Sequence, residues 1–208
     1  MNGFLEKITL YDLLGYTIPG FVFLLIMLYG MYSRDTLVLL ETYKNYNGFL
    51  AIVLLVASYL VGIAMSELGR MLDNIITKVL KKENMPDNME SIKHAMANSK
   101  FWEGQTDLEV NANAIKMMYS DIQTDENYKR IHNYASAGVM YKNMFTSLLG
   151  GNIILLFRHM FFGINYPYFN ICFCVLLLLA LIFLVRWKRF EGKTTNYTIN
   201  WFIKKYTN

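Results

Sequence analysis

Residues 48–66 read GFLAIVLLVASYLVGIAMS, a run without a single charged side chain. A helix needs about 20 mostly apolar residues to cross the hydrocarbon core of a bilayer. This stretch therefore predicts a transmembrane helix, and residues 13–32 and 168–185 predict two more. The composition agrees, because 54% of the 208 residues are hydrophobic and only 17% are charged, against roughly 25% in a soluble domain. We expect a polytopic membrane protein.

A further apolar segment, residues 135–162, contains two basic residues. Lys142 and Arg158 bracket an uncharged stretch that would be roughly 22 Å long as a helix at about 1.5 Å per residue. This is short for a bilayer, but both side chains can extend toward opposite interfaces and lengthen the reach of the helix. We therefore predict four transmembrane helices, with this segment as helix three.

Lys and Arg are unevenly distributed over this topology. Arg34, Lys44 and Arg158 would lie on one side, and the other 17 of the 20 basic residues on the opposite side. Because cytoplasmic segments carry the excess of Lys and Arg, both termini are predicted to be cytoplasmic. An odd number of helices would place the basic residues after position 185 outside, so the charge distribution also favours helix three.

The segment between helices two and three is expected to form cytoplasmic helices. Apolar residues continue past residue 66 at helical spacing, which predicts an amphipathic rod that projects into the cytoplasm. These residues are Leu68, Met71, Leu72, Ile75, Ile76, Val79 and Leu80. A short helix is expected over residues 88–101, and another through Ile122 after a capping box of Thr106 and Glu109.

The remaining segments complete an all-α prediction. Thr124 is expected to cap a helix that runs directly into helix three. Residues 195–206 are expected to form a short helix, either on the inner leaflet or docked against the cytoplasmic helices. The predicted organisation is 1–66 for transmembrane helices one and two, 67–134 for the cytoplasmic helical region, 135–187 for transmembrane helices three and four, and 188–208 for a cytoplasmic juxtamembrane tail.

The sequence contains none of the common catalytic or cofactor motifs. A Walker A loop, G-x-G-x-x-G, H-E-x-x-H and the nucleophile elbow are all absent. The predicted topology separates His94, His132 and His159, so they cannot form one metal cluster within a subunit. Cys172 and Cys174 fall in an apolar run, where thiols behave as small hydrophobes. We predict a protein that is not an enzyme and holds no cofactor or metal.

Two sets of residues suggest how the helices interact. Ser58, Gly62 and Ser66 repeat every fourth residue on helix two, which predicts a face where another helix packs closely. Glu67 and Arg70, one turn apart, fit an interfacial salt bridge, or else a gating pair or a lipid head-group site.

Helix three is unusually polar for a membrane helix. Asn143, Ser147 and Asn152 must face protein or water, because lipid offers no hydrogen-bond partners. One interpretation is interhelical hydrogen bonding in a tight bundle. The other is a pore formed by several copies, lined by these residues and flanked by Lys142 and Arg158.

Several stretches resemble small bacterial membrane proteins encoded beside anti-phage defence genes. The resemblance rests on residues 11–21 (YDLLGYTIPGF), 59–62 (YLVG) and 66–70 (SELGR), and on the entry to helix three, 132–134 (HNY) and 141–144 (YKNM). The group includes four-helix accessory proteins of RNA-targeting CRISPR systems and membrane effectors of nucleotide-signalled defence. The resemblance implies an inner-membrane effector or sensor that oligomerises and disturbs the membrane on a cytoplasmic signal.

Two functions from different classes follow. The leading one is a homo-oligomeric effector that permeabilises or depolarises the membrane when a cytoplasmic protein or nucleotide signal acts on its cytoplasmic helices. The alternative is a non-conducting scaffold or anchor that recruits a cytoplasmic partner. Both involve contact with membrane lipids, and neither requires direct binding of nucleic acid. A secondary transporter ranks last, because the chain has no inverted repeat and no midplane carboxylate.

Overall fold

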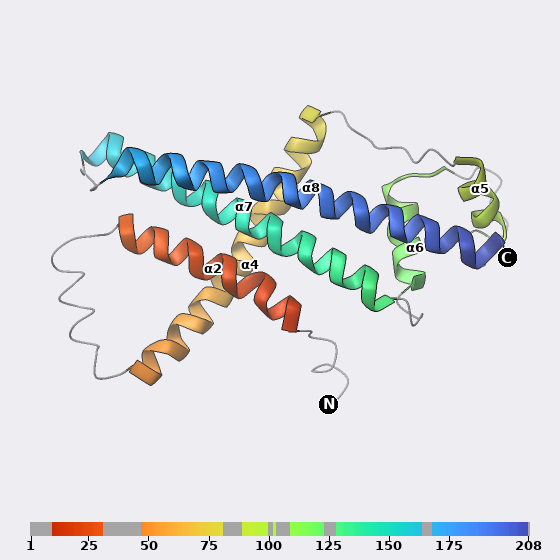
Figure 1. The fold of residues 1–208 in the computed structure, drawn as a ribbon, viewed down its shortest axis with the longest axis horizontal. Coiled ribbons are helices and arrows are strands. Elements are labelled where there is room, and N and C mark those ends of the chain that lie inside the picture. The colour runs from red at the N-terminus through yellow and green to blue at the C-terminus, as the bar shows by residue number, and fades with distance from the viewer. Residues whose placement is uncertain are drawn as a thin grey trace. The chain divides into compact units, whose positions relative to one another are not determined.

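The computed structural model describes residues 10–30, 47–80, 89–99, 102, 109–122, 128–163 and 168–207. These residues form six α-helices (Figure 1): α2 (Leu10–Gly30), α4 (Asn47–Leu80), α5 (Met89–Ala97), α6 (Ala112–Ile122), α7 (Tyr128–Phe162) and α8 (Phe169–Thr207). Within the described residues there is no strand. The all-α prediction is confirmed over this part of the chain.

Three of the helices are long and apolar enough to cross a membrane. The qualifying stretches are Gly48–Ile76 in α4, Ile131–Phe161 in α7 and Phe169–Thr207 in α8. In α2 the apolar stretch Leu14–Gly30 is shorter. Large apolar side chains of α8 such as Ile171, Val175 and Val185 are exposed, as expected for a helix surrounded by lipid.

The long helices continue well beyond their uncharged runs. α4 runs for 34 residues without a break, as the apolar spacing past residue 66 predicts. α8 runs for 39 residues, so the prediction of a separate short helix over residues 195–206 was wrong. The linking residues favour helix, since the ion pair between Lys188 and Glu191 (2.9 Å) has the i, i+3 spacing that supports a helical turn.

The start of α6 differs from the sequence-based prediction. Glu109 precedes the helix, which begins at Ala112, and Thr106 lies outside the described residues. Asn111 is the N-cap instead, because its side-chain oxygen accepts hydrogen bonds from the backbone N–H groups of Asn113 (3.1 Å) and Ala114 (3.0 Å). Asn caps a helix as well as Thr does, so spacing alone could not choose between the two starts. The predicted cap Thr124 also lies outside the described residues.

The chain divides into two compact units. The first, called the bundle, comprises residues 1–76 and 136–187, and the second, called the α5–α6 unit, comprises residues 77–135 and 188–208. The core of the bundle is formed by Ile26, Phe145, Leu148, Leu155, Ala180 and Trp187, from α2, α7 and α8.

The α5–α6 unit has a hydrophobic core of its own. Ile92 and Met96 of α5, Met118 of α6 and Phe202 near the end of α8 are all buried in it. The rings of Trp102 and Phe202 meet edge to face with centroids 5.6 Å apart, a favourable aromatic geometry. The C-terminal part of α8 is therefore a core element of this unit.

Candidate functional site

The site begins where α2 and α4 cross. A Cβ placed on Gly20 would overlap the backbone carbonyl of Ser58 and lie 2.7 Å from the backbone nitrogen of Gly62, and a Cβ on Gly62 would overlap the carbonyl of Tyr16. Ser58 is buried and donates its hydroxyl to the Leu54 carbonyl oxygen (2.6 Å). Two glycines thus let the two backbones touch.

The predicted packing residues occupy different places relative to this crossing. Ser58 and Gly62 lie in it, while Ser66, one turn further along α4, is half-buried. The rings of Tyr16 and Tyr59 meet edge to face beside the crossing, with centroids 6.1 Å apart.

Asn143 of α7 compensates for a proline in α2. Pro19 is buried within α2 and has no N–H, so the carbonyl of Gly15 lacks its usual partner four residues ahead. The side-chain nitrogen of Asn143 donates a hydrogen bond to that carbonyl oxygen at 3.0 Å. The polar side chain of Asn143 therefore forms a hydrogen bond between α7 and α2.

A double-mutant cycle tests this pairing. Asn143→Leu should destabilise the bundle by about 1 kcal/mol, because the Gly15 carbonyl is left buried without a donor. In a Pro19→Ala background the backbone N–H of residue 19 can bond the same carbonyl, so the effect of Asn143→Leu should shrink or reverse. Thermal unfolding of the four purified proteins in one detergent measures both effects. Equal effects in the two backgrounds would contradict the pairing.

Other polar atoms of α7 are buried without a partner. Ser147 is fully buried and Asn152 is 2% exposed. Their side-chain polar atoms, together with the Asn143 side-chain oxygen, have no hydrogen-bond partner among the described residues. Leu148 and Leu155, both in the core of the bundle, lie one turn to either side of Asn152. A primary amide thus lies on the apolar face of α7, where each unpaired polar group costs about 1–3 kcal/mol.

The glycines of this region bring α7 close to α2 and α4. A Cβ on Gly151 would lie 2.8 Å from a methyl group of Ile26 in α2. A Cβ on Gly69 of α4 would lie 2.8 Å from the Thr146 hydroxyl and 3.2 Å from the Lys142 Cγ. The polar side chains of α7 are therefore enclosed by protein in this conformation.

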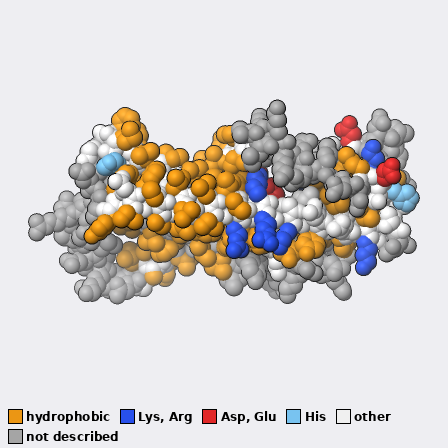
Figure 2. Space-filling view, turned by 45° about the horizontal axis from the view of Figure 1, so that its top comes forward, with side chains coloured by type: hydrophobic (Ala, Val, Ile, Leu, Met, Phe, Trp, Pro, Cys, Tyr) orange, Lys and Arg blue, Asp and Glu red, His pale blue; other side chains and the backbone are white. Residues whose placement is uncertain are grey.

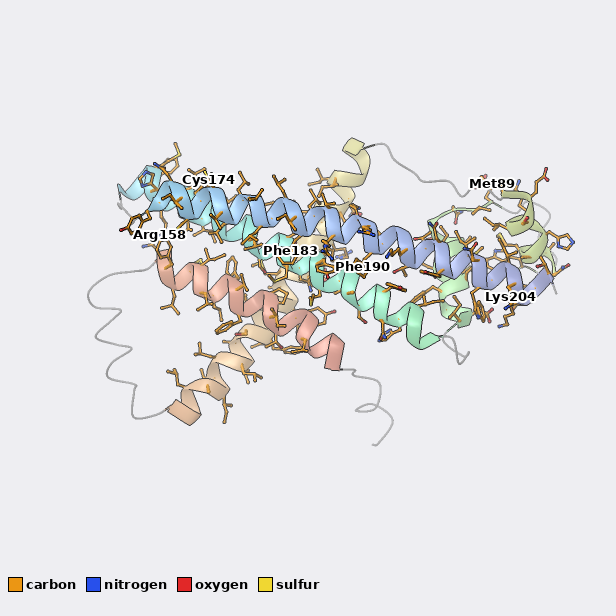
Figure 3. All side chains as sticks on the ribbon, viewed as in Figure 1. Met89, Arg158, Cys174, Phe183, Phe190 and Lys204 are labelled. Carbon is orange, nitrogen blue, oxygen red and sulfur yellow. The ribbon has the colours of Figure 1, made fainter. Side chains whose placement is uncertain are left out.

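The charged residues predicted at the site are not gathered with these amides. Glu67 and Arg70 form an ion pair at 2.9 Å, and their side chains are 63% and 69% exposed. An exposed pair of this kind contributes at most about 1 kcal/mol, which fits the salt-bridge interpretation. Lys142 is half-buried beside α4, and Arg158, half-buried, lies near the C-terminal end of α7 (Figure 3).

A polar cluster that the sequence analysis missed fixes the end of α8. Asp121 of α6 is buried, and its carboxylate oxygens accept hydrogen bonds from the Lys205 ammonium (2.9 and 3.0 Å) and the Tyr206 hydroxyl (3.0 Å). The side chain of Asn98, the residue that follows α5, also donates to the Tyr206 carbonyl oxygen (3.0 Å). The available signal was Asp121 itself, an acidic residue next to the apolar stripe of α6.

The protonation of this cluster gives its stability a pH dependence. Burial lowers the pKa of Lys205, but the hydrogen bond and charge of Asp121 outweigh it and raise the pKa above the ordinary 10.5. Burial and the same carboxylate raise the pKa of Tyr206 above 10.0. Both groups bind protons more tightly when folded, so their stabilisation is complete below about pH 10 and is lost as the pH rises through the raised pKa values.

We expect alkaline pH to loosen the end of α8. Amide hydrogen exchange over residues 199–206, corrected for the intrinsic pH dependence of exchange, should accelerate above pH 10.5 in the unchanged protein. Asp121→Asn should reduce this pH dependence, because neither proton is then held by a carboxylate and only burial still raises the pKa of Tyr206. Lys204→Gln, at the neighbouring basic residue, is the matched control and should behave like the unchanged protein. If Asp121→Asn keeps the full alkaline response, the cluster is not its origin.

Comparisons with known proteins add no assignment to this site. No protein-family model, no curated protein and no solved structure matches the chain. Over the described residues no group of three or more His, Cys, Asp or Glu side chains is placed to hold a metal ion. The candidate site is therefore defined by the buried polar side chains of α7.

Proposed function

We propose that this chain is an effector of bacterial anti-phage defence in the inner membrane, without catalytic activity. In this proposal α2, α4, α7 and α8 are the four transmembrane helices, and both termini are cytoplasmic. The protein forms homo-oligomers and permeabilises the membrane when a cytoplasmic protein or nucleotide signal reaches it, without binding nucleic acid directly. The observation that carries the proposal is the buried Asn152 amide, which has no hydrogen-bond partner among the described residues.

An unpaired buried amide favours a second conformation. The same amide would be hydrated if α7 turned it toward a water-filled space, such as one enclosed by several copies. Relief of about 1–3 kcal/mol per group shifts an equilibrium between two conformations by a factor of roughly 5 to 150. The buried Asn152 amide can therefore keep the bundle close to a switching point.

Helix continuity supplies a route for the signal. α7 and α8 each run unbroken from residues of the α5–α6 unit into residues of the bundle. A ligand or partner that binds one conformation of the α5–α6 unit more tightly would therefore act on helices that also belong to the bundle.

The test is a charge at position 152. Asn152→Asp should depolarise cells in the absence of phage, because an unpaired carboxylate is far more costly to bury than an amide and favours the hydrated conformation. Membrane potential is measured with a voltage-sensitive dye at matched amounts of membrane-inserted protein. Asn152→Gln, which keeps the amide, is the control and should not depolarise the cells. An unchanged potential with Asn152→Asp would contradict the proposal.

One observation favours a second candidate, a non-conducting scaffold that recruits a cytoplasmic partner. The α5–α6 unit has its own hydrophobic core and polar cluster, as a binding module requires. A scaffold should tolerate Asn152→Asp without loss of protection from phage. Its protection should instead be lost on charge reversal at exposed positions of α5 and α6, such as Lys93→Glu or Lys116→Glu.

A further inference from the structure

The exposed face of α4 remains apolar beyond the end of its uncharged run. Leu68, Met71 and Ile75 are 47%, 61% and 58% exposed. On the adjoining face of the helix, Leu72 and Ile76 pack against the core of the bundle. Among the described side chains of the predicted amphipathic stripe, two thus pack against the core and three are exposed. The three exposed ones form an apolar surface that requires a different explanation.

This apolar surface is continuous with the face that α4 presents within its uncharged run. Leu60 is 60% exposed, and with 3.6 residues per turn Leu68, Met71 and Ile75 lie within about 80° of it around the helix axis. From Leu60 to Ile75 the stripe is about 22 Å long at 1.5 Å per residue. Figure 2 shows how hydrophobic side chains gather on the surface of the chain. Leu60 and the rest of the stripe form one exposed apolar surface, so the same apolar surroundings would stabilise both.

Charges beside the stripe match a lipid surface. Arg70 lies on its flank, about 80° from Leu60 around the helix axis, and is exposed. Exposed basic residues next to apolar side chains are typical of segments that bind the head groups of anionic lipids. Glu67 borders the stripe, but its ion pair with Arg70 (2.9 Å) reduces repulsion from such lipids.

We propose that Leu68, Met71 and Ile75 contact the lipids of the leaflet at which the uncharged run of α4 ends. Because α4 is unbroken, the stretch Gly48–Ile76 is about 42 Å long at 1.5 Å per residue and matches a bilayer of roughly 40–45 Å including its head groups. The stripe then lies among the head groups, whereas the sequence pattern was interpreted as a rod that projects into the cytoplasm. This inference needs α4 in a membrane and is independent of whether the protein conducts ions.

Site-specific fluorescence tests the contact. Cys172 and Cys174 are the two cysteines of the chain, so Cys172→Ser with Cys174→Ser provides a background for single labels. Met71→Cys and Ile75→Cys are labelled with the environment-sensitive dye NBD, and the protein is reconstituted in vesicles of phosphatidylcholine and phosphatidylglycerol. Quenching by lipids with a nitroxide near the head group is compared with quenching by aqueous iodide. Leu60→Cys is the control for lipid, and Glu90→Cys on the exposed side of α5 is the control for water.

We expect labels at 71 and 75 to emit at shorter wavelength than the label at 90 and to be quenched by the lipid nitroxide, with little quenching by iodide. Strong iodide quenching at both positions would overturn the inference and restore a helix that projects into water. Protection from both quenchers would also overturn it, because the stripe would then be covered by protein. Neither result depends on depolarisation, so this test and that of the proposed function can fail separately.

Discussion

Gly20→Ala is expected to destabilise the bundle by about 3 kcal/mol, near the upper end of the usual range for overpacking. A single methyl group at this position meets the backbone of α4 at Ser58 and Gly62, and backbone cannot move aside as a flexible side chain can. α2 must therefore separate from α4 to accommodate it. Since Asn143 is bonded to α2 as well, the separation should also weaken the contact between α2 and α7.

Gly15→Ala is the matched control for this change. Gly15 lies five residues earlier in the same helix, and a Cβ there would have no atom within 4 Å. Because alanine favours helix over glycine by about 1 kcal/mol, this variant should be neutral or slightly more stable. Thermal unfolding of the purified proteins in the same detergent gives the comparison. Equal stability of the two variants would show that α2 and α4 do not cross at Gly20.

Asn152→Leu is expected to have the opposite effect and stabilise the bundle by about 1–3 kcal/mol. Leucine has a similar size and removes a buried amide that has no partner among the described residues. The new side chain would extend the apolar surface formed by Leu148 and Leu155. If the hydrated conformation is the conducting one, the same substitution should also abolish depolarisation, since it removes the group that favours that conformation.

Substitution by leucine is expected to change stability in opposite directions at Asn152 and at Asn143, which lies on the same helix. Asn143→Leu removes the hydrogen bond to the Gly15 carbonyl and should lower the unfolding temperature, whereas Asn152→Leu should raise it. Both are the same substitution on the same helix, so general effects of leucine on α7 are matched. A loss of stability with Asn152→Leu would mean that this amide has a partner in the folded protein, and the switching argument would lose its basis.

The sequence predicts the helical class and most of the long elements because they depend on local pattern. The uncharged run and the apolar spacing from Leu68 to Leu80 predict that α4 continues past residue 66, and the helix does continue to Leu80. Helix ends were harder to place. Asn111, rather than Thr106, caps α6, and the sequence pattern alone does not choose between two suitable caps that lie close together.

The site could be predicted only in part, because its function depends on pairing between distant segments. Pro19 and Asn143 are each conspicuous in the sequence, one as a helix breaker and the other as a buried amide. Their connection through the Gly15 carbonyl joins residues 128 positions apart, and no local pattern encodes that register. Asp121 likewise binds Lys205 across a separation of 84 residues.

The central claim is that the chain changes membrane permeability, and membrane potential tests it most directly. Bacteria that express the unchanged protein or Asn152→Leu at equal membrane levels are followed with a voltage-sensitive dye during phage challenge. We predict depolarisation of the cells with the unchanged protein and a maintained potential with Asn152→Leu. Protection from phage by the unchanged protein at a constant membrane potential would contradict the claim and favour the scaffold.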